Sequence, residues 1–235
     1  MAGKGSVGIM TITHGRSREN VRRWPDDPTA RRRLEDYFDY LDKLPDDSRT
    51  VASLLNGGGL DFRGADLSGL DLVEAELSDA NLSGVRLVGA DLYHAWLIGA
   101  ALRGADLSHC DLRKVEGRAC DAQGAILRGA DLDRSEFEDA DLRRADFREA
   151  QFGQARLTGA DLRGADLRQC TFGQSRYSTG FEETRFADCL VEEAKGTVDG
   201  PIDVGTDSPR LLDGADLQRW FVDHSAPQVA VWSPA

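Results

Sequence analysis

Residues 64–78 read GADLS-GLDLV-EAELS, and this five-residue pattern continues along the middle of the chain. Almost every unit has an apolar centre, most often Leu, at intervals of five from Phe62 to Tyr177. A small residue, most often Ala, precedes the centre by two positions. No insertion breaks this phase, so the sequence predicts one elongated repeat body with flanking segments.

The alternation of side chains decides how one unit lies. In an extended segment, residues two apart point to the same side, so the small residue and the central Leu or Phe face inward together. The Asp or Asn between them then points outward. Only two residues remain before the next unit, which is room for a tight turn, and Gly fits a turn that needs positive φ.

Units such as GADLS at 64–68 and DANLS at 79–83 resemble those of the pentapeptide-repeat family, over about 60–191. The resemblance implies an all-β fold, a right-handed quadrilateral β-helix with four units per coil. Residues twenty apart would then stack in columns. At a spacing of about 4.8 Å, about six to seven coils are expected, and six would make a rod of roughly 29 Å.

The flanking segments, 1–59 and 192–235, do not follow the pattern. Asp27 as N-cap, Pro28 at the first position and apolar residues at three- and four-residue spacing predict an amphipathic helix over 28–43. A second short helix is expected over 48–55, ended by the glycines at 57–59. We expect both to cover the open first coil, because a repeat array exposes core and unpaired backbone at its ends.

The C-terminal segment is predicted to be a small α/β unit. It would have strands near 200–204 and 228–232 and a helix that begins after Asp213. The apolar side of this helix consists of Leu217, Trp220 and Phe221. Two interpretations stay open: this side caps the last coil, or it makes a homodimer contact.

The stacking predicts three kinds of outward charged column. Two columns place arginines beside aspartates: Arg103, Arg143 and Arg163 beside Asp141 and Asp161, and Arg128, Arg148 and Arg168 beside Asp146 and Asp166. Surface ion pairs are worth little each, so a self-neutralising lattice is favoured over an arginine-bearing recognition face. A third column holds Asp71, Asp91, Asp111 and Asp131 and is locally acidic. These aspartates either contact a partner or bond to their own turns.

One outward cluster is apolar and consists of Tyr93, Trp96 and Ile98. Exposed aromatic patches are typical of interfaces. Either a terminal segment of the chain covers this cluster or an external partner binds it.

Two irregularities interrupt the pattern. The central Leu is missing at Gly117 and Ala122, but the spacing is kept. This favours a continuous coil in which Phe137, one coil above Gly117, fills the space, over a partner-binding loop at 115–124. The step from Tyr177 to Phe181 is four residues, which indicates the loss of one residue and a looser last coil.

Composition excludes several function classes. Of the net charge of −12, the repeat body at 60–191 carries −8, which does not suit direct nucleic-acid binding. No apolar run approaches the roughly 20 residues of a membrane span, and the N-terminus lacks the apolar core of a signal peptide. A cytoplasmic location is therefore expected, with reduced cysteines.

Chemical motifs are lacking as well. No His/Cys cluster has metal-ligand spacing, and no nucleophile elbow or dinucleotide fingerprint occurs. The sequence therefore predicts no catalytic residue, no metal and no cofactor.

The main interpretation is a non-catalytic protein-interaction scaffold. The resemblance offers an alternative, because some pentapeptide-repeat proteins imitate the shape and charge of duplex DNA, bind bacterial DNA gyrase and protect it from inhibitors such as quinolones or albicidin-like toxins. A third, an enzyme or small-ligand binder that uses the flanks, would need an unfilled pocket between the body and the C-terminal segment.

Overall fold

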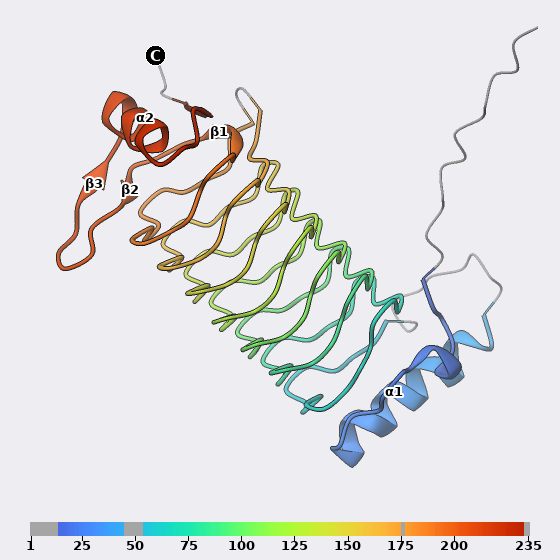
Figure 1. Ribbon diagram of the computed structural model, residues 1–235. Helices are drawn as coiled ribbons and strands as arrows, with labels where there is room; N and C mark the ends of the chain where they lie inside the picture. Colours follow the sequence, from blue (N-terminus) through green and yellow to red (C-terminus); the bar gives the residue numbers. More distant parts are fainter. Residues whose placement is uncertain (1–13, 45–53, 175–176, 233–235) are drawn as a thin grey trace, which may run out of the picture.

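The computed structural model describes residues 14–44, 54–174 and 177–232. The described chain is an elongated rod of stacked coils (Figure 1). Helix α1 (Pro28–Leu41) lies at one end of the rod, and helix α2 (Gly214–Asp223) lies at the other. The repeat forms the rod itself.

Parallel backbone bridges join residues that are twenty apart. The bridges run from Asn56–Glu76 to Gln151–Thr171, one for every five-residue unit. In one of them, Leu72 N donates to Asp91 O at 2.8 Å and Asp91 N donates to Leu70 O at 2.9 Å. Each coil therefore has four units and four faces, and a turn after every unit keeps each paired stretch short.

The interior is filled by the side chains of the repeat. The small residues and the central Leu and Phe residues are buried along the whole rod. Towards the C-terminal end, successive phenylalanine rings from Phe147 to Phe186 lie 5.1 to 5.9 Å apart between centroids. Each fully buried Leu or Phe contributes about 1.5–3 kcal/mol to the free energy of unfolding, so this packed column holds the coils together.

The gap in the repeat at Gly117 is a continuous coil, as predicted. The bridges Trp96–Glu116 and Glu116–Glu136 continue through it. A Cβ atom at Gly117 would lie 2.7 Å from Cδ1 of Phe137, so the ring of Phe137 occupies the missing side chain's space. The alternative of a loop at 115–124 is wrong.

The irregularity near Tyr177 differs from the prediction. The bridge offset changes from twenty to twenty-four residues, as in Arg156–Gly180, so four residues are inserted instead of one being lost. Gln174 and Tyr177 exchange backbone hydrogen bonds of 3.2 and 3.0 Å, so these two residues lie side by side. Phe181 takes the central position and is fully buried, whereas Tyr177 is 54% exposed. Tyr177 is therefore not the centre of a repeat unit.

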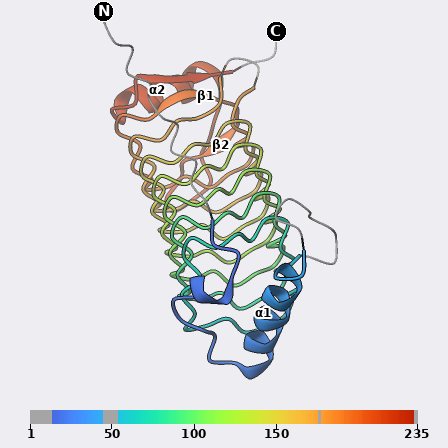
Figure 2. The ribbon, with the colours of Figure 1, turned by 90° about the vertical axis from the view of Figure 1, so that its right-hand side faces the viewer.

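The predicted N-terminal helix is α1. The carboxylate of Asp27 accepts the N–H of Ala30 at 2.8 Å, Pro28 is the first residue, and the helix buries Leu34 and Phe38. Of the second predicted helix, residues 48–53 lie outside the described residues. The segment before α1, which includes a 3₁₀ turn at Arg18–Asn20, lies along the first coils (Figure 2).

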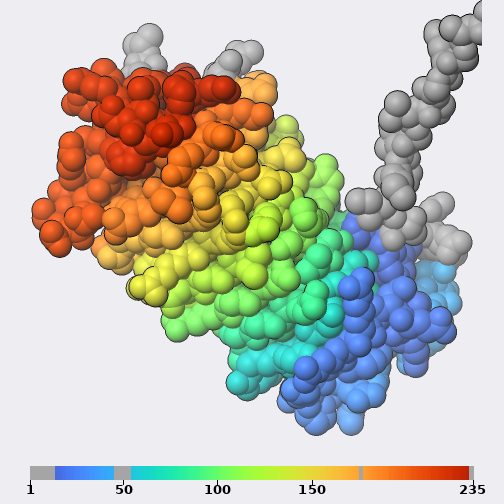
Figure 3. Space-filling view, in the orientation of Figure 1, coloured from blue at the N-terminus to red at the C-terminus, as the bar shows by residue number. Residues whose placement is uncertain are grey.

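The C-terminal segment is a small α/β unit. Strand β1 (Lys195–Val198) pairs in parallel with β4 (Gln228–Val231), and β2 (Ile202–Asp203) pairs antiparallel with β3 (Leu211–Leu212). Helix α2 begins after Asp213, as predicted. This unit covers the last coil in the space-filling view (Figure 3). Neither helix among the described residues has the length and apolar character that a membrane crossing requires.

Candidate interaction surface

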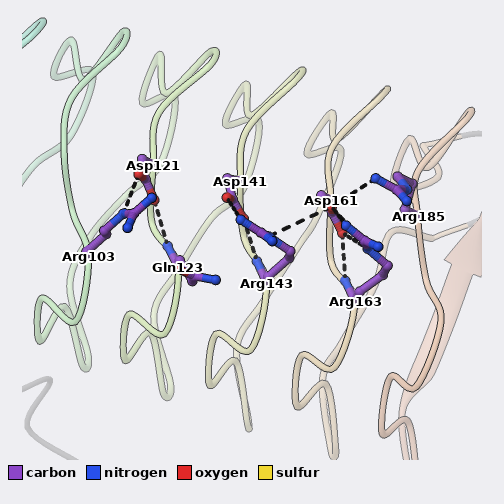
Figure 4. A network of polar contacts seen from close by, with 8 residues as sticks. All are labelled: Arg103, Asp121, Gln123, Asp141, Arg143, Asp161, Arg163 and Arg185. Atoms are coloured by element: carbon purple, nitrogen blue, oxygen red, sulfur yellow. Dashed lines mark hydrogen bonds and ion pairs between the residues drawn. The ribbon is translucent and has the colours of Figure 1, made fainter.

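Two faces of the rod carry paired arginines and aspartates. On the first, the carboxylate of Asp161 accepts hydrogen bonds from Arg163 at 2.6 and 2.8 Å and from Arg185 at 3.2 Å (Figure 4). On the second, hydrogen bonds from Arg148 lower the pKa of Asp146 to about 2. Both columns agree with the predicted self-neutralising lattice, which leaves these faces little net charge to offer a partner.

A third face is acidic. We call it the acidic face; it comprises the units centred on Leu72, Leu92, Leu112, Leu132, Phe152 and Phe172. Successive bridges join its outward residues Asp71, Asp91, Asp111 and Asp131 into one column. Burial raises the pKa of Asp91 and of Asp131, and the charge of Asp111 adds to both shifts. The folded protein therefore disfavours the charged forms of Asp91 and Asp131, whereas it favours the charged form of Asp146.

Among the described arginines of the repeat, Arg113 contacts this column. Its guanidinium bonds to Asp111 at 2.8 and 2.5 Å and lies 3.8 Å from Asp131. Among the described residues, the ion-pair partner of Asp91 is His14, whose Nδ1 lies 3.6 Å from Oδ2. The acidic face therefore has several carboxylates for each firmly bound cation.

The N-terminal segment occupies one end of this face. Gly15 N donates to Gly69 O at 2.8 Å, and Asp71 N donates to Gly15 O at 2.9 Å. The side chain of Asp71 lies 3.5 Å from Arg16, and Tyr37 donates its hydroxyl to the Asp71 carbonyl at 2.7 Å. Asp71 is only 5% exposed, so its prediction as an exposed partner contact is wrong: the chain's own residues cover it.

The apolar cluster spans two faces. Tyr93 lies on the acidic face, Trp96 and Ile98 lie on the next face, and His94 is at the corner between them. The His94 ring is 6.1 Å from that of Tyr93 and 5.6 Å from that of Trp96. Cations of Arg113 and Lys114 lie 5.5 and 5.2 Å from the Tyr93 ring. These partly exposed aromatic rings are therefore continuous with the acidic column through Tyr93.

The opposite end of the acidic face contains a groove of about 440 Å³. It extends from Arg113 and Asp131 to Gly173 and Tyr177. Sequence reasoning missed this site because it assigned Tyr177 to the core. A usable signal was present, however: Gly153 and Gly173, twenty apart, stand where other units carry an outward side chain.

A larger groove of about 1030 Å³ lies between the last coil, the β2–β3 hairpin and α2. Its lining includes Cys189, whose thiol donates to Leu162 O at 3.0 Å and has a pKa raised by burial. The His224 ring in the same lining stacks on Trp220 at 4.1 Å, and its Nδ1 lies 2.7 Å from the Trp220 carbonyl oxygen. Among the described residues, no group of three His, Cys, Asp or Glu residues could hold a metal ion.

The predicted helix residues Leu217, Trp220 and Phe221 meet the end of the rod. Leu217 and Phe221 are fully buried, and the Phe186 ring lies 6.0 Å from Trp220 and 6.4 Å from Phe221. The apolar side of α2 is thus in contact with the last coil of its own chain.

The chain forms a parallel solenoid of five-residue units. Its own side chains fill the interior, and its polar residues form outward columns. These features define a class of repeat protein. The model of pentapeptide repeats matches residues 61–97, 95–134 and 135–174, in 8 copies. Through these residues the chain belongs to the pentapeptide-repeat family. Pentapeptide-repeat proteins fold as right-handed β-helices and are generally non-catalytic.

Solved structures of the family are similar to this chain. QnrB1 (full length), a plasmid-mediated fluoroquinolone resistance protein, has a TM-score of 0.56 and 19% identity, over 63% of this chain and 76% of that one. A pentapeptide repeat protein of the Arabidopsis thaliana thylakoid lumen has a TM-score of 0.33 and 27% identity, over 48% and 68%. The likeness to QnrB1 shows the fold alone. A comparison with curated proteins found no match.

Proposed function

We propose that this protein is a non-catalytic scaffold that binds a protein partner through its acidic face. The observation that carries the proposal is the column of Asp91, Asp111 and Asp131, which Arg113 contacts and no other described arginine of the repeat contacts. The two arginine-bearing faces neutralise their own aspartates. A rigid surface with more carboxylates than bound cations favours association with an oppositely charged partner surface, because little conformational entropy is lost on binding.

The proposal includes the architecture and location of the scaffold. The rod has about six to seven coils, which are spaced about 4.8 Å apart. It is capped by residues 1–59 at one end and by residues 192–235 at the other, with the repeat body at 60–191. It acts in the cytoplasm, where its four buried thiols stay reduced.

A pull-down from the native cell extract tests the acidic face. The bait proteins are the unchanged chain, Asp131→Lys, and Glu182→Lys as the control. Glu182 is exposed and lies on a different face. Its replacement by lysine changes the charge by the same amount as Asp131→Lys. We expect a partner that the unchanged chain and Glu182→Lys retain and that Asp131→Lys loses. Equal retention by both variants would rule out the acidic face as the binding surface.

A second candidate is a DNA mimic that binds bacterial DNA gyrase and protects it from quinolones. The regular acidic column supports it, since the column places an outward carboxylate about every 4.8 Å along the rod, and one strand of duplex DNA places a phosphate roughly every 3.4 Å along its axis. The neutralised arginine-bearing faces and the covered Asp71 make the rod less evenly negative than DNA, which favours the general scaffold. A gyrase supercoiling assay, with and without a quinolone, tests this candidate. If the protein at micromolar concentration neither inhibits gyrase nor protects it, this candidate is eliminated.

A further inference from the structure

The groove at the C-terminal end of the acidic face arises from three departures from the repeat. The outward column changes from aspartate to Gln151 and then Thr171. The next outward position becomes glycine, at Gly153 and Gly173. Exposed Tyr177, which no longer takes the central position of a unit, lines the groove with them. All three changes open the same face, and together they produce the groove of about 440 Å³.

The dimensions of the groove suit an extended chain. Its lining spans the levels of Arg113, Asp133, Gly153 and Gly173, each one coil above the last. Three steps of about 4.8 Å give a length of roughly 14 Å, which is about four residues of extended chain at about 3.3 Å each.

The groove offers polar groups that the protein does not itself use. Among the described residues, the side-chain amides of Gln151, Gln154 and Gln174 have no hydrogen-bond partner. An amide side chain both donates and accepts hydrogen bonds, as a peptide backbone does. Three such groups along one groove can bond to the backbone of an extended segment.

Two carboxylates at the start of the groove have only long ion pairs among the described residues. Asp131 lies 3.8 Å from Arg113, whose guanidinium is held more closely by Asp111. Asp133 lies 3.7 Å from Arg134. Both carboxylates line the groove, and burial raises the pKa of Asp131. A cation placed between them would stabilise the ionised pair.

We infer that this groove binds an extended segment of a protein partner and receives a lysine or arginine side chain of that segment between Asp131 and Asp133. The inference rests on the proposed scaffold function and names the partner's chemistry at this site. The glutamine amides hold the segment's backbone, and Tyr177 forms the far wall.

Peptide titration followed by ¹H–¹⁵N NMR tests the site directly. The probes are the blocked tripeptides Ser-Lys-Ser and Ser-norleucine-Ser, which differ only in the charged end of one side chain. We expect the lysine peptide to shift the amide signals of Gly153 and Gly173 and to saturate. The norleucine peptide is expected to bind at least tenfold more weakly. Equal binding of both peptides, or no shift with either, would overturn the inference.

A pair of variants separates this site from general attraction to an acidic protein. The double variant Asp131→Asn with Asp133→Asn removes both charges. It keeps a side-chain oxygen at position 131 that can accept the backbone N–H of residue 133, which donates to Asp131 Oδ1 at 3.0 Å in the unchanged chain. We expect this variant to weaken the lysine peptide at least fivefold. The control, Asp146→Asn on an arginine-bearing face, should leave the affinity unchanged. Equal weakening by both variants would contradict the inference. It would also be contradicted if a neutral trisaccharide shifted the amide signals of the two glycines and the lysine peptide did not.

Failure of the groove and failure of the scaffold give different results. If the pull-down retains a partner that Asp131→Lys loses, but the lysine peptide does not bind, the groove inference fails and the scaffold stands. If the peptide binds and no partner is retained, the scaffold proposal fails by itself.

Discussion

At the scale of single residues, the turns place one residue of each unit in the left-handed region. Glycine is the usual residue there, as at Gly104 with φ +62°. Other units place ordinary residues in the same conformation, such as Ala119 with φ +54°. A residue with a Cβ atom is disfavoured there by about 1–2 kcal/mol, so the backbone pairing of the coils holds these turns in place.

A reciprocal exchange of Gly and Ala measures this turn strain. Gly104→Ala should lower the free energy of unfolding by about 1 kcal/mol, since a Cβ atom there meets no other atom within 4 Å and only the backbone is strained. Ala119→Gly should raise it by about 0.5 kcal/mol, the relieved strain less the entropy of glycine in the unfolded chain. Urea denaturation measures both. Ala101→Gly, at a bridge position, is the control and should destabilise; an Ala119→Gly variant as unstable as this control would contradict the argument.

The two kinds of aspartate should respond to pH in opposite ways. Burial raises the pKa of folded Asp91 above its ordinary value of 3.8, so its charge destabilises the fold above the folded pKa. Asp91→Asn should therefore be more stable than the unchanged chain at pH 7, with a difference that vanishes as the pH falls below about 4. Asp146 has a lowered pKa of about 2, so its stabilisation is present above its ordinary value of 3.8 and disappears as the pH falls towards 2.

Urea denaturation from pH 7 to pH 2.5 tests both signs. Asp146→Asn should be less stable at pH 7, by about 1 kcal/mol or less because the pair is partly solvated. Asparagine keeps an oxygen for the backbone N–H of Tyr93 or Arg148, so the variants isolate the charge. Destabilisation of both variants at pH 7 would contradict the difference between the two faces.

At the scale of elements, the coil through Gly117 depends on the ring of its neighbour. Leucine at Gly117 restores the usual unit but overlaps Phe137. Gly117→Leu should destabilise the protein by about 2 kcal/mol. Gly117→Leu combined with Phe137→Leu should recover most of this loss, with an interaction energy of about 1–3 kcal/mol in a double-mutant cycle. Additive effects of the two changes would show that the ring does not fill this space.

The sequence predicts the coils well because one short period decides which side chains face inward. The gap at Gly117 was predictable for the same reason, since the spacing was kept. Tyr177 was not: it is aromatic and stands five residues after Phe172, so only the backbone pairing distinguishes an inserted turn from a repeat unit. The burial of Asp71 was equally hidden, because Gly15 reaches it by a non-local pairing that leaves no periodic signal in the sequence.

At the scale of the whole molecule, α2 packs the C-terminal unit against the last coil. The Trp220 ring lies 6.0 Å from Phe186 and 5.1 Å from Phe221. Trp220→Ala should lower the melting temperature, with a loss of about 2 kcal/mol because the ring is partly buried. Size-exclusion chromatography with light scattering should give the same mass for this variant and the unchanged chain. A dimer that dissociates in Trp220→Ala would favour the homodimer interpretation instead.

The bridges between successive coils also decide how the rod responds to force. They lie along the rod axis, so a pull on the two ends loads the hydrogen bonds of the terminal coil first, and neighbouring coils support it only through one interface. Peeling one coil releases about 20 residues, or roughly 67 Å of extended chain after the original spacing is subtracted. In optical tweezers, the protein should therefore lengthen in repeated steps of about this size, whereas one abrupt extension would mean that the coils fail together.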